Sequence, residues 1–260
     1  MAAKNAAPDT ERDLSFHPAD PSRARTLTPE QVEHFNDRGY IMPLDALDDA
    51  EADAQRDYFD MLMEETARRG GNSYSINGYH TRCRGLYDLC VTPRILDYVQ
   101  DILGPNFLVW GTHYFCKTPH DPKAVPWHQD ASYWPLTPSR TVTVWLAIDD
   151  VDVHNSAMRF IAGTHRMGHL AFKQTEQQAV LGQEVLDAET LGDIVDVELK
   201  AGQISLHSDM LVHGSLPNQS DRRRCGLTIR YVSTDVRPIN PDWGTRAILC
   251  RGTNDRPWWR

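Results

Sequence analysis

The hydrophobic pattern of the chain changes from helical to extended at Gly104-Pro105, and this change limits the folds that the sequence can adopt. Before it, the pattern predicts helices over residues 27–38, 48–69 and 93–103. After it come short runs rich in Val, Ile, Thr, Tyr, Phe and Trp, typical of strands, over residues 107–117, 141–148, 158–161, 202–208 and 225–232. A helical N-terminal third followed by many strands predicts an α+β chain, mainly β, with a sandwich or barrel core.

The rest of the pattern predicts a single domain. Neither an internal repeat nor a break in composition divides residues 27–260. Residues 1–26 contain proline and charged residues without an apolar segment, which predicts a flexible tail rather than a secretory signal. Residues 70–91 show no hydrophobic period, so we expect a loop there.

Charge and cysteine content argue against several partners. The chain has 27 Lys and Arg against 36 Asp and Glu, a net charge of −9, which disfavours a nucleic acid or an anionic membrane as partner. No apolar run approaches the roughly 20 residues of a membrane helix. The five cysteines form no CxxC motif, which fits a reducing compartment. We therefore expect a cytoplasmic protein, a monomer or a homodimer, that acts on a small molecule.

The tetrapeptide Trp127-His128-Gln129-Asp130 is the strongest local candidate for a metal site. In an extended segment the side chains of residues i and i+2 lie on the same side, so His128 and Asp130 can bind one metal ion together. Imidazole and carboxylate suit Fe(II) and similar ions. Because a His-x-Asp tripeptide also occurs in surface turns, a third ligand from another strand is needed to make the case.

His213 is the candidate for that third ligand, because strand-like residues precede it and a turn follows. A second His-x-Asp, formed by His207 and Asp209, competes with it. On a straight strand positions 207 and 213 are about 20 Å apart, so they could share a metal only if the strand doubled back. We therefore predict that His207 and Asp209 are strand or turn residues and that His213 joins the first pair.

Arg224 is the candidate for an anion-binding residue. It begins a predicted strand whose alternate residues face the interior. A buried guanidinium requires a carboxylate, which it can bind through two parallel hydrogen bonds. The sequence leaves open whether that partner is an Asp of the protein or a dicarboxylate co-substrate.

Three segments of the chain resemble the phytanoyl-CoA dioxygenase family. They are residues 126–130 (PWHQD), residues 155–165 (NSAMRFIAGTH) and residues 213–224, in which His-Gly-Ser and Pro-Asn precede Arg224. The likeness runs from about Leu27 to Gly252. It implies a double-stranded β-helix, a cupin-like jelly roll, with the N-terminal helices packed on one sheet. It also implies an Fe(II)- and 2-oxoglutarate-dependent oxygenase.

The resemblance implies roles for single residues. His128, Asp130 and His213 would bind Fe(II), and Asp130 favours hydroxylation because halogenating members have a small residue at that position. The co-substrate contacts that it implies are Arg224 and Ser215 at the distal carboxylate of 2-oxoglutarate, with Trp145 and His113 against the rest of it. Candidate substrate contacts are Tyr133 and Trp134, just past the metal pair, and Asn77 and Arg82 in the predicted loop.

We therefore predict a dioxygenase that uses O₂ to hydroxylate a C–H bond of a small polar metabolite or natural-product intermediate, releasing succinate and CO₂. Polar residues in the predicted loop favour a polar or anionic substrate over a long acyl chain. Two alternatives remain at this point. One is a cupin-like metal-dependent isomerase or hydrolase that does not use 2-oxoglutarate, and Arg224 argues against it. The other is a non-catalytic jelly-roll binding module, which the intact triad disfavours.

Overall fold

The structure, a computed structural model, describes residues 12–175 and 179–259. Its α-helices are α1 (Pro29–Arg38), α2 (Asp49–Arg68), α3 (Arg84–Cys90) and α4 (Pro93–Leu103). Its strands are β1 (Tyr40–Asp45), β2 (Phe107–Lys117), β3 (Val125–His128), β4 (Leu136–Thr137), β5 (Thr141–Ala147), β6 (Met158–Ile161), β7 (Phe172–Gln174), β8 (Gln183–Val185), β9 (Ile194–Val197), β10 (Gln203–Ser208), β11 (His213–Ser215), β12 (Arg224–Ser233), β13 (Arg237–Pro238) and β14 (Ile248–Arg251).

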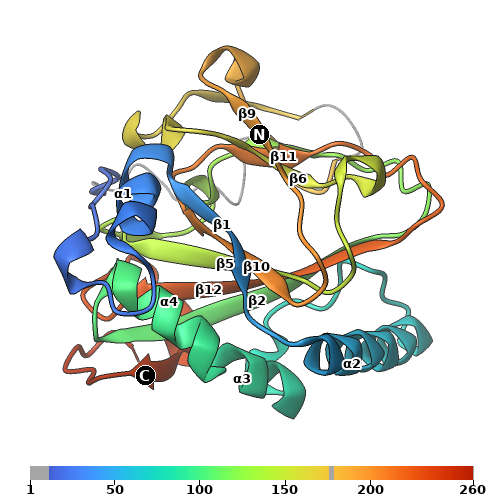
Figure 1. Cartoon of the computed structure of the whole chain (residues 1–260), viewed down its shortest axis with the longest axis horizontal. Coiled ribbons are helices and arrows are strands. Elements are labelled where there is room, and N and C mark those ends of the chain that lie inside the picture. The colour runs from blue at the N-terminus through green and yellow to red at the C-terminus, as the bar shows by residue number, and fades with distance from the viewer. Residues whose placement is uncertain (1–11, 176–178, 260) are drawn as a thin grey trace.

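Two main antiparallel sheets form the body of the described chain. The larger has the order β1-β10-β5-β12-β2-β14, and the smaller has the order β3-β11-β6-β9. Figure 1 shows α2, α3 and α4 below the larger sheet and the smaller sheet on the opposite side of it. Neighbouring strands that are far apart in sequence are the mark of a jelly roll. The predicted fold, a jelly-roll core with N-terminal helices on one sheet, is confirmed.

Strand β12 shows how the two faces of the larger sheet differ. Cys225, Leu227 and Ile229 are fully buried in the apolar core that the sheet shares with the helices. The alternate residues Arg224 and Thr228 line a cavity on the other face. Because both faces of β12 are covered, a charged side chain on either face is buried. Such a charge requires a ligand or another residue to balance it.

The sequence predicts the helices well where capping signals exist. The Thr28 hydroxyl accepts a hydrogen bond from the Gln31 amide (3.2 Å), and the Gln31 side chain accepts one from the Thr28 amide (2.8 Å). Gly39, with φ of +87°, ends the same helix. The prediction of a loop over residues 70–91 is wrong in part, because α3 lies within it. No side-chain cap starts α3, and its buried residues hold it against the core instead.

The segment before α1 packs on the domain, which corrects the expected flexible tail for residues 12–26. Arg12 donates a hydrogen bond to the carbonyl of Ala131 (2.9 Å). The Asp101 carboxylate accepts three hydrogen bonds from the backbone amides of residues 25–27, at 3.0, 2.7 and 2.8 Å. These contacts tie the segment to both the barrel and α4. Residues 1–11 of the expected tail lie outside the described residues. No helix in the described part of the chain is long and apolar enough to cross a membrane.

Candidate functional site

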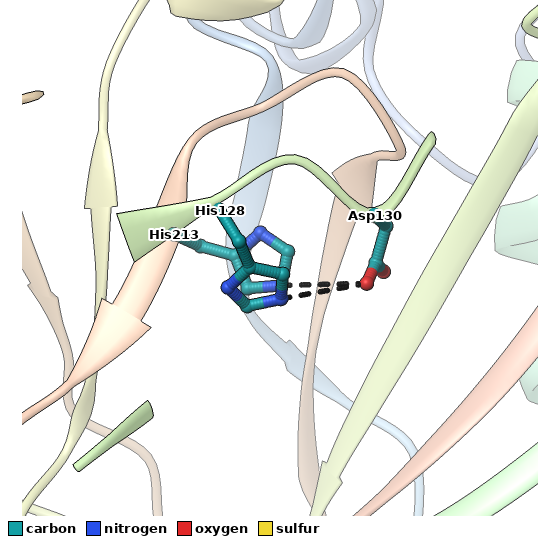
Figure 2. A group of neighbouring side chains, drawn as sticks. All are labelled: His128, Asp130 and His213. Carbon is teal, nitrogen blue, oxygen red and sulfur yellow. Dashed lines mark ion pairs between the residues drawn. The ribbon is translucent and has the colours of Figure 1, made fainter. Parts of the chain in front are cut away.

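Two strands and the turn after one of them bring the three predicted metal ligands together. His128 ends β3, His213 begins β11, and the two residues are direct partners in the antiparallel pair. Gln129 has extended backbone angles (φ −105°, ψ 127°), so Asp130 lies on the same side as His128, as the sequence predicts. Figure 2 shows the three side chains pointing toward one another.

The distances within this triad fit a single metal ion. Nε2 of His128 lies 3.5 Å from Oδ1 of Asp130, and Nε2 of His213 lies 3.9 Å from the same oxygen. Among the described residues, these three form a group that offers one ligand atom each, all within 4.8 Å of one another, and all three side chains are buried. Two imidazoles and one carboxylate are the ligand set of non-haem Fe(II) oxygenases.

Hydrogen bonds to the backbone fix which ring nitrogen of each histidine faces the metal position. Nδ1 of His128 lies 2.8 Å from the carbonyl oxygen of Pro126, and Nδ1 of His213 lies 2.9 Å from that of Leu211. A carbonyl oxygen can only accept, so each Nδ1 carries the proton. Each Nε2 therefore offers its lone pair toward Asp130, which is the arrangement that orients metal-binding histidines.

The protonation states also suit a cation. Burial alone would raise the pKa of Asp130, but the adjacent imidazoles of His128 and His213 and the positive charge of Arg230 hold it well below its usual value. Burial, followed by the proximity of His128, lowers the pKa of His213 well below its usual value. At neutral pH the site thus contains an ionised carboxylate and a neutral His213, the forms that bind metals.

A third imidazole, that of His207, lies beside the triad. The expectation that it lies far from His213 is wrong, because the chain turns back after β10, where the Leu211 amide donates to the Ser208 carbonyl (3.0 Å). The rings of His207 and His213 are consequently 4.8 Å apart. His207 is nevertheless outside the group of three ligand atoms. Asp209, the other half of this motif, accepts a hydrogen bond from the Ser139 hydroxyl (2.6 Å) in a turn.

Arg224 is almost fully buried at 2% exposure and has a hydrogen bond on each of its three nitrogens. They go to the carbonyls of Ser156 (3.0 Å) and Phe115 (3.3 Å) and to the hydroxyl of Ser215 (3.2 Å). All of these partners are uncharged. In residues 12–175 and 179–259 no carboxylate oxygen lies within 4.0 Å of the Arg224 guanidinium. The protein Asp that the sequence left open as its partner is therefore not found among them.

The triad and Arg224 line one cavity of about 220 Å³ between the two sheets. The other predicted contact residues that line it are Trp145, His113, Ser215, Tyr133, Trp134 and Asn77. Arg82 differs from them: it is exposed and is not among the lining residues. The cavity thus brings together residues from the helical third and from both sheets.

Comparisons with known proteins identify the family of this chain. A family model described as "Phytanoyl-CoA dioxygenase (PhyH)" matches residues 23–226. The chain belongs to the phytanoyl-CoA dioxygenase family. A curated relative, "Phytanoyl-CoA dioxygenase, peroxisomal" of Bos taurus, is 24% identical over 255 residues, which cover 87% of this chain and 75% of the relative.

Two further relatives of this dioxygenase family are informative. The "Probable alpha-ketoglutarate-dependent hypophosphite dioxygenase" of Stutzerimonas stutzeri is 29% identical over 153 residues, 56% of this chain and 52% of that protein. Among solved structures, the "non-heme monooxygenase; ThoJ apo" superposes with a TM-score of 0.74 and 31% identity, covering 85% of this chain and 83% of that one. The predicted enzyme class, an Fe(II)- and 2-oxoglutarate-dependent dioxygenase, is confirmed.

Two residues of this family member lie at the site without having been singled out from the sequence. The buried side chain of Gln129 donates to the carbonyls of Gly168 (3.0 Å) and Met210 (2.8 Å), so it fixes the segment between His128 and Asp130. Arg230 lines the cavity. Its even spacing from Arg224 on one strand is the signal that could have found it, because residues six apart share a face.

Proposed function

We propose that this dioxygenase hydroxylates a C–H bond of a small polar metabolite or natural-product intermediate, with His128, Asp130 and His213 as the iron ligands. Arg224 and Ser215 bind the distal carboxylate of 2-oxoglutarate. The observation that carries the proposal is that the triad and a buried arginine without a described carboxylate partner line the same cavity. A buried cation in that position is stable only with an anion beside it.

The residues fit an iron ion by the chemistry of their donor atoms. When bound, Fe(II) would supply the redox chemistry that couples O₂ and the decarboxylation of 2-oxoglutarate to C–H oxidation, with succinate and CO₂ as products. The protein holds the two imidazoles in one tautomer through backbone carbonyls. It also steadies the carboxylate, because the Thr143 hydroxyl lies 3.4 Å from Oδ2 of Asp130.

Aromatic residues around the cavity position the co-substrate and exclude water. Trp145 is 2% exposed and lies 5.8 Å from the guanidinium carbon of Arg224, measured from the ring centre. Tyr133 closes another part of the wall, and its hydroxyl accepts a hydrogen bond from the amide of Gln183 (3.1 Å). A dry cavity strengthens the electrostatic contacts on which the chemistry depends.

The size of the cavity supports a small substrate. Its volume of about 220 Å³ is below the roughly 300–1,000 Å³ of pockets for drug-sized ligands. A cavity of this size that also holds 2-oxoglutarate has little room for a long acyl chain. The name of the Stutzerimonas stutzeri relative, a probable hypophosphite dioxygenase, gives a small polar substrate within the family. Asp130 keeps the third protein ligand in place, which favours hydroxylation over halogenation.

The two alternatives left open by the sequence receive less support. An isomerase or hydrolase with the same fold does not require a buried arginine that can bind a dicarboxylate. A non-catalytic module has no need for two histidines fixed in the metal-binding tautomer. Membership of a dioxygenase family favours the oxygenase over both.

Succinate formation tests the proposal directly. The purified chain, loaded with Fe(II) under anaerobic conditions, is supplied with O₂ and 2-oxoglutarate, and succinate is measured while a library of small metabolites is screened. We expect substrate-stimulated succinate that requires Fe(II) and is lost in Asp130→Ala. Stimulation by fatty acyl thioesters and by no polar metabolite would contradict the proposed substrate class, and no succinate under any condition would contradict the proposed reaction.

A further inference from the structure

Arg230 is a second arginine on the cavity face of β12. Arg224 and Arg230 are six residues apart on one strand, so their Cα atoms are separated by roughly 20 Å. Both line the cavity, together with Thr228 between them. The two guanidiniums also have different neighbours, since that of Arg230 lies over the ring of Trp134 and that of Arg224 over the ring of Trp145. The two cations therefore lie at different ends of the site.

The surroundings of Arg230 hold it in place without using its hydrogen-bond donors. Its guanidinium carbon lies 5.2 Å from the ring centre of Trp134 and 5.7 Å from that of Trp110. Gly111, its strand partner on β2, leaves room beside it, because a Cβ there would lie 3.7 Å from Cδ of Arg230. Ring faces attract the planar guanidinium and leave its N–H groups free at the edge.

None of these N–H groups is used within the described chain. Nε of Arg230 is buried without a hydrogen-bond partner. No carboxylate oxygen of residues 12–175 and 179–259 lies within 4.0 Å of the guanidinium. His207, which lines the same cavity, also has both ring nitrogens buried and unpartnered. A buried donor without a partner destabilises the folded chain, so such a group points to a ligand that satisfies it.

The charges present in the loaded site indicate the charge of that ligand. In the loaded enzyme the two charges of Fe(II) and the one of Arg224 are matched by Asp130 and the doubly negative co-substrate. The positive charge of Arg230 is left over. Lys117 adds none at neutral pH, because burial lowers its pKa to about 6. One uncompensated positive charge in a low-dielectric cavity calls for one negative charge on the substrate.

We infer that Arg230 is the binding residue for the primary substrate, and that this substrate is a small organic acid with a single carboxylate. This inference rests on the proposed function and names its substrate class. The two terminal N–H groups of the guanidinium match the two oxygens of a carboxylate. Arg230 holds the acid end, and the C–H bond to be oxidised lies between that end and the triad. Arg230 is thus a residue for specificity, whereas Arg224 serves the co-substrate.

Equilibrium dialysis tests this assignment. The full chain, loaded anaerobically with Fe(II) and 2-oxoglutarate, is dialysed against radiolabelled butyrate or its neutral analogue butyramide. We expect the wild type to prefer butyrate by about tenfold or more, and Arg230→Gln to lose that preference. Arg230→Lys, which keeps the charge but not the paired donors, should retain part of it. Arg68→Gln, at an exposed ion pair on α2, is the matched control and should behave as wild type.

Retention of Fe(II) and 2-oxoglutarate is measured in the same cells. If the wild type and Arg230→Gln both retain them and bind butyrate equally, Arg230 is not the anion site and the inference is overturned. Equal binding of butyrate and butyramide by the loaded wild type would overturn it as well. If the wild type fails to retain Fe(II) and 2-oxoglutarate, the proposed function itself fails, and the inference fails with it.

Discussion

The two ends of β12 use the same residue type in opposite ways. At one end Arg224 is fixed by hydrogen bonds from all three of its nitrogens to Ser156, Phe115 and Ser215. At the other end Arg230 has no hydrogen bond among the described residues and is held by the faces of two tryptophans. Fixed donors suit a ligand that is the same in every turnover, which in the proposed function is the co-substrate. Ring faces leave the guanidinium free to adjust, which suits a substrate that enters and leaves.

In the proposed roles, Arg224 and Arg230 bind two different anions at opposite ends of one strand, on different sides of one metal ion. His128 and His213 lie on the opposite, smaller sheet, in β3 and β11, and Asp130 lies in the turn after β3; all three line the cavity. A carboxylate bound at either arginine is therefore directed toward the metal from a different side. Substitutions in the triad should abolish the reaction of both the co-substrate and the substrate. Substitutions on β12 should weaken binding at one arginine and leave binding at the other unchanged.

The largest effect is expected at the triad, where two neighbouring imidazoles can be compared. His213→Ala should weaken Fe(II) binding about a hundredfold or more, because loss of a ligand exceeds the 10–100-fold cost of losing a ligand's supporting partner. His207→Ala, whose ring is 4.8 Å away but outside the ligand group, should change Fe(II) affinity by less than about threefold. Anaerobic dialysis with iron analysis measures both. Equal losses in the two variants would contradict the assignment of the triad.

The second-largest effect is expected on 2-oxoglutarate affinity, at the Arg224 end of β12. Arg224→Ala should raise the Kd for 2-oxoglutarate about a hundredfold or more, because removal of one partner of a buried ion pair costs about 3–5 kcal/mol. Arg222→Ala is the matched control, since Arg222 is exposed and pairs with Asp152 on the surface. Calorimetric titration gives the affinities, and a thermal melt reports on folding. A lower melting temperature with unchanged 2-oxoglutarate affinity would make Arg224 a structural residue.

Two glycines on neighbouring strands, Gly226 on β12 and Gly111 on β2, offer a smaller test of the same separation. A Cβ on Gly226 would lie 2.0 Å from the ring of the buried Trp145, whereas one on Gly111 would lie 3.7 Å from Arg230, an ordinary contact. Gly226→Ala should therefore cost about 1–3 kcal/mol of stability and raise the KM for 2-oxoglutarate. Gly111→Ala should leave both unchanged within error. Urea unfolding and succinate assays check this pair, and equal behaviour would mean that Trp145 moves aside freely.

The last effect is a pH dependence of stability at the Arg224 end. Lys117 is buried opposite Arg224 and donates to the Ser156 hydroxyl (3.1 Å) and the Leu216 carbonyl. Burial, and then the charge of Arg224, lowers its pKa to about 6. Between pH 6 and 10 the unfolded chain carries a proton on Lys117 that the folded chain lacks, so this residue makes the free energy of unfolding rise with pH.

The expected slope from Lys117 is about 1.4 kcal/mol per pH unit. Lys117→Met removes the titrating group, so the stability difference between wild type and variant should change by this amount per unit from pH 6.5 to 8.5. Urea unfolding at several pH values measures it. A constant difference across that range would show that Lys117 keeps its ordinary pKa in the folded chain.

Much of the fold could be predicted from the sequence because its signals are local. Thr28 and Gln31 form the predicted capping box, and α4 spans Pro93–Leu103 as its Pro and Gly boundaries predict. The helix α3 could not be predicted in this way. It begins at Arg84 without a capping side chain, and it exists because Leu86 and Leu89 are buried against residues distant in sequence. Local propensity contains no information on that burial.

The candidate site shows the same division. The His-x-Asp spacing and the alternation of β12 are local, so His128, Asp130 and Arg224 could be singled out before the structure was known. The position of His207 depends on a turn after β10, and a straight-strand distance therefore misplaced it. The environment of Arg230 depends on Trp110 and Trp134, which lie about a hundred residues earlier in the chain. Only the tertiary fold brings these rings to the guanidinium.

The most direct measurement is a crystal structure of the chain loaded anaerobically with Fe(II) and 2-oxoglutarate. We predict one metal ion bound by Nε2 of His128, Nε2 of His213 and a carboxylate oxygen of Asp130, at about 2.0–2.2 Å. We also predict that the far carboxylate of 2-oxoglutarate lies on Arg224 and that Arg230 remains free of it. A metal bound elsewhere, or 2-oxoglutarate held by Arg230 instead of Arg224, would contradict the account.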